Sequence, residues 1–93
     1  MEKLYKLSNK NYLFVQALTD DNGWDYYYLD GTTRRALDGG ILETDDCEWD
    51  TPITDTLIRT ILGCFEGTKF EKELQNITFK EDKSLNFWDD FEA

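Results

Sequence analysis

The 93-residue sequence contains no histidine, two cysteines and a single proline. Without histidine it lacks the commonest general base near neutral pH and the usual partner of a nucleophilic serine or cysteine. Two cysteines alone are also too few for the common structural zinc sites. The composition therefore disfavours metal centres and acyl-transfer active sites, and we expect a protein that is not an enzyme and has no cofactor or metal.

Basic residues are scarce, with 10 Lys and Arg against 20 Asp and Glu and a formal net charge of −10. Nucleic-acid backbones and anionic lipid surfaces are bound through clustered Lys and Arg, so we expect neither direct nucleic-acid binding nor membrane binding. The sequence also lacks an apolar run that approaches the roughly 18 residues of a membrane span, and its first residues lack the apolar stretch of a signal peptide. The expected location is the cytoplasm, where Cys47 and Cys64 would be reduced thiols.

What the chain does contain is enough for one small core, with 40% hydrophobic and 15% aromatic residues. We expect a single domain over residues 1–93, with its core at about 11–80. The acidic segment 81–93 is expected either to form a final amphipathic turn or to remain a loose tail.

Three segments predict an antiparallel meander. Residues 12–18 and 24–29 are aromatic and branched, and the Asn22-Gly23 pair between them tolerates the positive φ of a hairpin turn. A third strand is predicted at 33–37. The Asp38-Gly39-Gly40 sequence should interrupt it, as a bulge or a change of direction, before Ile41-Leu42 resumes the apolar pattern.

A helix is predicted at about residues 52–66, with Thr51 as its cap and Pro52 at its first position. Its apolar positions recur at helical spacing, at Ile53, Leu57, Ile58, Ile61, Leu62 and Phe65. A short second helix is expected at about 70–74 and a short strand at 77–79. The predicted fold class is α+β: a small antiparallel meander sheet of three to four strands packed against one main helix, with a short second helix.

Acidic residues are concentrated in the middle of the chain, where residues 20–55 carry eleven acids and two arginines. Carboxylates held on a rigid surface can imitate the phosphates of duplex DNA, although an acidic surface that only aids solubility is the simpler interpretation. Asp25 and Tyr27 should share one face of their strand, near Arg34 or Arg35 on the next, with a composition suited to a protein interface. The candidate partner-binding residues are Asp20, Asp21, Asp25, Tyr27, Asp45, Asp46, Glu48 and Asp50.

Two other chemical interpretations of these segments are weaker. Asp20, Asp21, Asn22 and Asp25 suggest a calcium loop, but the loop lacks the alternating oxygen ligands and the closing bidentate glutamate. The 38–40 turn lacks the lysine and the helix N-terminus of a phosphate-binding loop. We therefore expect a solvated hairpin turn and a strand bulge at these places.

The segments 23–30 (GWDYYYLD) and 37–43 (LDGGILE), followed by an acidic stretch and a helix, resemble short acidic modules of Gram-positive phages and mobile elements. This resemblance covers about residues 12–66. A second resemblance lies in residues 70–80 (FEKELQNITFK), which are similar in pattern to the C-terminal part of an anti-CRISPR protein.

The second resemblance implies an inhibitor that binds the PAM-reading surface of a CRISPR-Cas effector nuclease in the bacterial cytoplasm by acidic DNA mimicry. It implies a protein partner with a basic surface and no small-molecule substrate. The alternative is a protein-interaction module of a mobile element with no inhibitory role.

Overall fold

The computed structural model describes residues 1–18, 23–44 and 51–92. In these ranges the chain forms strands and short helices, in agreement with the predicted α+β class. The strands are β1 (Glu2–Leu7), β2 (Tyr12–Ala17), β3 (Gly23–Leu29), β4 (Ala36–Glu43) and β5 (Phe79–Glu81). The helices are α1 (Asp55–Gly63), α2 (Glu71–Leu74) and α3 (Phe87–Asp90).

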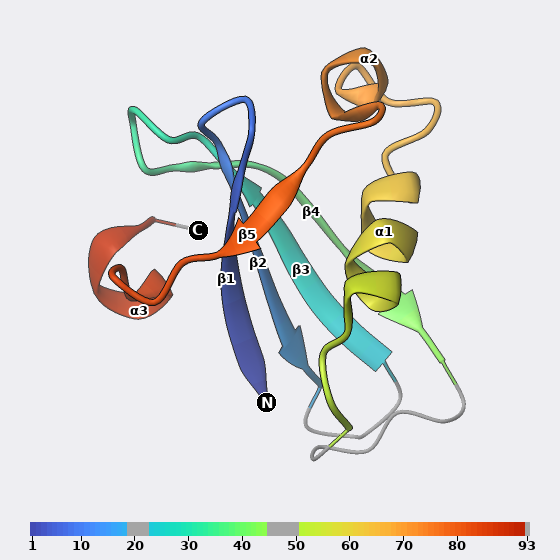
Figure 1. The fold of residues 1–93 in the computed structure, drawn as a ribbon, viewed down its shortest axis with the longest axis horizontal. Coiled ribbons are helices and arrows are strands. Elements are labelled where there is room, and N and C mark those ends of the chain that lie inside the picture. The colour runs from blue at the N-terminus through green and yellow to red at the C-terminus, as the bar shows by residue number, and fades with distance from the viewer. Residues whose placement is uncertain (19–22, 45–50, 93) are drawn as a thin grey trace.

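The strands form one antiparallel sheet in the order β4-β3-β2-β1-β5 (Figure 1). The meander from β2 to β4 was predicted, but β1 was missed and the C-terminal strand begins two residues later than predicted. In β1, Leu4 packs on one side of the sheet while Tyr5 and Leu7 pack on the other. Burial on both sides hides the simple apolar and polar alternation by which a half-buried strand is recognised.

The predicted interruption of the third strand at residues 38–40 is wrong, because β4 runs through both glycines. The irregularity lies one residue earlier: Tyr28 pairs with Asp38 while Leu29 pairs with Ala36, which leaves Leu37 as the extra residue. The glycines are needed for a different reason. A Cβ at Gly39 would lie 2.9 Å from the Cδ1 atom of Tyr27, so the tyrosine rings of β3 occupy the space of the missing side chains.

α1 begins three residues after the predicted start because Thr54, and not Thr51, caps it. The Oγ1 atom of Thr54 accepts a hydrogen bond of 3.2 Å from the amide of Leu57. Pro52 lies before the helix, and α1 ends at Gly63, where the amide of Cys64 bonds the carbonyl of Ile61 at 3.0 Å. Cys64 is a free and exposed thiol.

One side of the sheet, the first face, shares a buried cluster with α1 and α2. Its sheet members alternate along the strands: Tyr5, Leu7, Leu13, Val15, Trp24, Tyr26 and Tyr28. The helical segments contribute Ile58, Ile61, Leu62 and Leu74. Figure 1 shows α1 and α2 together on this side.

The opposite side, the second face, is covered by α3, so the predicted arrangement with one helix on one face is incomplete. The Phe87 ring stacks on Phe14 with centroids 3.8 Å apart and planes 5° apart, and Phe91 packs edge-on against Tyr12 at 5.2 Å. Of the two alternatives for the C-terminal segment, the structure therefore contains the amphipathic turn.

A polar network around Tyr28 connects the elements of the first face. The Tyr28 side chain is fully buried, yet its hydroxyl group accepts hydrogen bonds from the side-chain amides of Asn9 (2.9 Å) and Asn11 (2.8 Å). It donates to the Glu73 carboxylate at 2.8 Å. The network thereby joins the β1–β2 turn, β3 and α2, and it satisfies a hydroxyl group whose burial would otherwise be costly.

We predict that Ile61→Ala lowers the free energy of unfolding by about 2–5 kcal/mol, because Ile61 is 0% exposed and its removal leaves a cavity. Leu57→Ala should cost less, since Leu57 is only half-buried. Thr56→Ala on the exposed side of α1 is the matched control and should change little. Urea denaturation monitored by circular dichroism measures all three, and a loss below about 0.5 kcal/mol for Ile61→Ala would contradict the described core.

We also predict a loss of stability in alkali that depends on Tyr5. Burial, with smaller contributions from the carboxylates of Glu81 and Asp55, raises the pKa of Tyr5 to about 12 from an ordinary value of 10.0. The folded state therefore holds the phenol proton more tightly than the unfolded state. The resulting stabilisation is complete below pH 10 and is lost as the pH rises to about 12. Urea titrations across this range should show a shallower decline for Tyr5→Phe; an unchanged pH profile would refute the assignment.

Candidate protein-interaction face

Two of the eight candidate partner-binding residues, Asp25 and Tyr27, lie within the described ranges. Both are on β3 and point to the second face, as predicted from their alternation with the buried Trp24 and Tyr26. The remaining candidates lie outside the described residues: Asp20, Asp21, Asp45, Asp46, Glu48 and Asp50. Their proposed grouping into a phosphate-like surface stays a prediction.

Asp25 is half-buried and positioned by its neighbours on both sides of β3. Its Oδ2 atom accepts a hydrogen bond of 3.1 Å from the side-chain amide of Gln16, its partner on β2. On β4 its partner is Ile41, and Gln16 in turn pairs with Glu2 on β1. Glu2, Gln16, Asp25 and Ile41 therefore form one row across four strands of the second face.

Tyr27 occupies the next row of the same face. Its ring stacks on Phe87 at 5.6 Å between centroids and 16° between planes, so α3 fixes its orientation. Its partner on β4 is Gly39, which has no side chain that could cover the Tyr27 ring. The ring is therefore only half-buried. An aromatic ring and a carboxylate thus lie side by side on a rigid strand.

The predicted proximity of Arg34 or Arg35 to these two residues is wrong. Both arginines precede β4, in a turn that is longer than the sequence suggested. Arg34 has a φ of 64°, and its guanidinium lies 5.5 Å from the ring centroid of Tyr12 and 5.1 Å from that of Phe91. It therefore stacks on the far end of the second face, where cation–π contact stabilises it.

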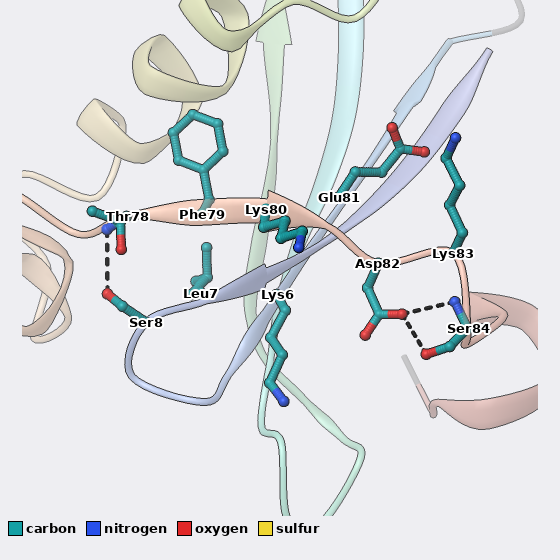
Figure 2. Close-up of a pocket in the computed structure, with 10 residues that line it drawn as sticks. All are labelled: Lys6, Leu7, Ser8, Thr78, Phe79, Lys80, Glu81, Asp82, Lys83 and Ser84. Atoms are coloured by element: carbon teal, nitrogen blue, oxygen red, sulfur yellow. Dashed lines mark hydrogen bonds between the residues drawn. The ribbon is translucent and has the colours of Figure 1, made fainter.

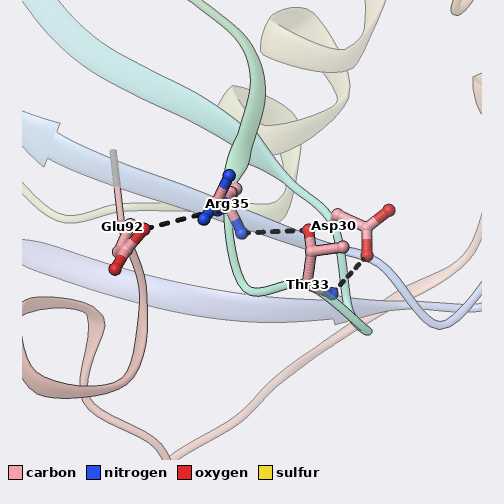
Figure 3. A network of polar contacts seen from close by, with 4 residues as sticks. All are labelled: Asp30, Thr33, Arg35 and Glu92. Atoms are coloured by element: carbon pink, nitrogen blue, oxygen red, sulfur yellow. Dashed lines mark hydrogen bonds and ion pairs between the residues drawn. The ribbon is translucent and has the colours of Figure 1, made fainter.

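Asp30 organises this turn, as Figure 3 shows. Its Oδ1 atom accepts hydrogen bonds from the amides of Thr32 (2.7 Å) and Thr33 (2.8 Å), and these bonds lower the pKa of the carboxyl group. The amide of Arg35 donates to Thr33 Oγ1 at 3.4 Å. The turn closed by these bonds extends from Asp30 to Arg35. The next strand, β4, therefore begins only at Ala36.

The C-terminal segment pairs with the beginning of β4. The amide of Glu92 donates to the carbonyl of Arg34 at 2.7 Å, and the amide of Ala36 donates to the carbonyl of Glu92 at 2.9 Å. The Arg35–Glu92 ion pair of 3.4 Å joins two side chains that are about three-quarters exposed, so it adds little stability (Figure 3). Beyond Ala36, the outer edge of β4 pairs with no strand in the part of the chain that the structure describes.

Three large apolar side chains are exposed around this face: Trp88 (60%), Ile41 (57%) and Leu37 (39%). Ile41 lies beside Asp25, and the Trp88 indole donates a hydrogen bond of 2.9 Å to Glu2 at the other end of the row. We call Glu2, Asp25, Tyr27, Ile41 and Trp88 the acidic–apolar face. Exposed apolar groups, above all aromatic ones, with polar residues around them mark many surfaces that bind another protein.

Trp88 and Ile41 were not among the predicted site residues, although the sequence pattern around Trp88 indicates that its side chain is exposed. Phe87 and Phe91 are four residues apart and share the buried side of a helical turn, which places the intervening Trp88 elsewhere. The exposure of Ile41 depends on the register of β4, and the bulge at Leu37 shifts that register by one residue.

A metal site and a membrane-spanning helix find no support in the described ranges. No group of three or more His, Cys, Asp or Glu side chains there is arranged to hold a metal ion. Nor does any described helix have the length and apolar character needed to cross a membrane.

Comparison with known proteins gives one informative result. The model of the family "Large polyvalent protein-associated domain 16" matches residues 1–80, from β1 to β5, and ends before α3. Neither the curated proteins nor the solved structures give a match. The family match supports the predicted association with phages and mobile elements, whereas nothing in it supports the resemblance to anti-CRISPR proteins. Since the match covers most of the sequence, the chain belongs to the large polyvalent protein-associated domain 16 family.

Proposed function

We propose that this chain is a non-enzymatic protein-interaction module of phages or mobile elements, and that it binds a basic surface of a partner protein through the acidic–apolar face. The observation that carries the proposal is the placement of Asp25 and Tyr27 beside the exposed Ile41 and in the same face as the exposed Trp88. The family context agrees with a module that works in association with other protein domains.

The chemistry of the face favours a partner that is both basic and apolar. Trp88 and Tyr27 are residue types that supply much of the binding energy at protein interfaces, and α3 holds both rings in place through Phe87. The carboxylates Glu2 and Asp25 lie in the same row of paired residues as Ile41. In a chain with a net charge of −10, these carboxylates attract cationic groups and repel anionic surfaces.

A narrower form of the proposal makes the partner a CRISPR-Cas effector nuclease. The concentration of eleven acids in residues 20–55 supports it, because the arginines that read the PAM bind negatively charged DNA and would also attract a rigid set of carboxylates. In this form Asp20, Asp21 and Asp25, together with the acids of segment 45–50, replace the phosphates of the duplex. The protein would then act in the bacterial cytoplasm.

The broader proposal predicts that Asp25→Asn combined with Trp88→Ala reduces partner retention at least about tenfold. The immobilised chain is exposed to nuclease-treated lysate of Gram-positive bacteria that carry mobile elements, and retained proteins are quantified by mass spectrometry. The control is Glu66→Gln, an exposed acid outside the acidic–apolar face. Circular dichroism verifies that each variant is folded. If the double variant retains the same proteins as the wild type, this face is not the interaction surface.

The narrower proposal predicts inhibition of DNA binding and cleavage by at least one guide-loaded effector nuclease, weakening as salt rises. Neutralising Asp20, Asp21 and Asp25 together, or Asp45, Asp46 and Glu48 together, should relieve the inhibition. An equal reduction of charge at Glu66, Glu71 and Glu92, which lie outside residues 20–55, is the control and should preserve it. Absence of inhibition across a panel of effectors, or identical inhibition by all variants, would eliminate DNA mimicry and leave the broader interaction proposal intact.

A further inference from the structure

The edge of the sheet opposite β4 contains a cavity of about 500 Å³. The end of β1, β5 and the residues after β5 line it (Figure 2). Its volume lies within the range of about 300–1,000 Å³ that small-molecule sites occupy. Three lysines line it, Lys6, Lys80 and Lys83, although the whole sequence has only 10 basic residues. Positive charge is thus concentrated at one place in a chain whose net charge is −10.

Lys6 and Lys80 are direct partners in the pairing of β1 with β5. Like charges at directly opposed positions of an antiparallel pair destabilise the sheet. Within the described residues, the ion pairs involve Lys3 with Glu81 and Arg35 with Glu92, and neither Lys6 nor Lys80 takes part in one. The pairing therefore places the two lysines next to each other at this edge, and neither ammonium group has a carboxylate as an ion-pair partner among the described residues.

The two carboxylates that line the cavity are already engaged. Glu81 forms its ion pair with Lys3 at 3.4 Å between Nζ and Oε1. The Oδ1 atom of Asp82 accepts hydrogen bonds from both the amide and the hydroxyl group of Ser84, as Figure 2 shows. Those bonds, and to a smaller extent the charge of Lys6, lower the pKa of Asp82. Asp82 thus reduces the positive potential near Lys6 without forming an ion pair with it.

Hydroxyl groups add uncharged hydrogen-bond donors to the lining of the cavity. Ser8 Oγ accepts a hydrogen bond of 3.2 Å from the amide of Thr78, which leaves the hydroxyl proton of Ser8 for another acceptor. Thr78 also lines the cavity. Ammonium groups combined with hydroxyl donors suit the oxygens of a phosphate or a carboxylate.

We propose that this cavity binds a small ligand through a multiply charged oxyanion group, a phosphate or a pair of carboxylates, held between Lys6 and Lys80 with Lys83 at the side of the cavity. The bound anion would offset the repulsion between the two opposed lysines. The site is separate from the acidic–apolar face and does not depend on the proposed interaction with a protein. Distant acids oppose anion binding only weakly, because salt at about 0.1 M screens charges beyond roughly 10 Å.

The test is an NMR titration of the full chain with inorganic phosphate, pyrophosphate and succinate, each at constant ionic strength. We expect saturable shifts of the amide signals of Ser8, Thr78 and Ser84 with at least one of these probes. A response to the phosphates alone identifies a phosphate ligand, and a response to succinate alone identifies a dicarboxylate. Lys80→Gln should weaken binding about tenfold, whereas Lys69→Gln, a lysine outside the cavity, should leave it within about twofold.

Thermal unfolding separates a binding defect from a folding defect. Without ligand, Lys80→Gln should unfold at the same temperature as the wild type or higher, because it removes a like-charge contact. The effective probe should raise the unfolding temperature of the wild type and much less that of Lys80→Gln. The proposal is refuted if no probe gives saturable shifts below about 10 mM, a generous limit for weak small-ligand affinities, or if Lys69→Gln loses binding as much as Lys80→Gln.

Discussion

Burial of one sheet on both of its faces is the constraint on which the rest of this structure depends. Successive residues of β2 point to opposite sides, so Leu13 and Val15 enter the first-face cluster while Tyr12 and Phe14 enter the second. A chain of 93 residues must then cover two faces with few helical residues. It does so with aromatic rings, which bury a large area for each residue and stack closely, as Phe87 does on Phe14.

The double burial also explains which parts of the fold could be predicted from the sequence. The meander of β2 to β4 and the amphipathic α1 have local signals in the sequence: the Asn22-Gly23 pair, which favours a hairpin turn, in one case and the spacing of Ile58, Ile61 and Leu62 in the other. β1 was missed because its apolar residues serve both faces. The start of α1 was displaced because Thr51 and Thr54 are both acceptable caps, and only the observed bond from Leu57 distinguishes them.

Side-chain proximity was harder to predict than secondary structure. The shared orientation of Asp25 and Tyr27 follows from strand alternation alone and was predicted. Their neighbours on β4 depend on the length of the turn that Asp30 closes and on the bulge at Leu37, so Gly39 and Ile41 occupy the positions expected for the arginines. The opposed Lys6 and Lys80 are far apart in sequence, and no local pattern indicates that long-range pairing.

Among the described residues, the outer edge of β4 beyond Ala36 pairs with no strand, which bears on association between identical copies. An exposed strand edge with Leu37 and Ile41 beside it is a template for pairing with another strand, which usually leads to aggregation. Here β4 itself carries Asp38 and Glu43, and each copy has a net charge of −10. Two such edges repel each other before their backbones meet. By this argument, the acidic charge disfavours pairing of β4 with a second copy of the chain more than pairing with a strand of opposite charge.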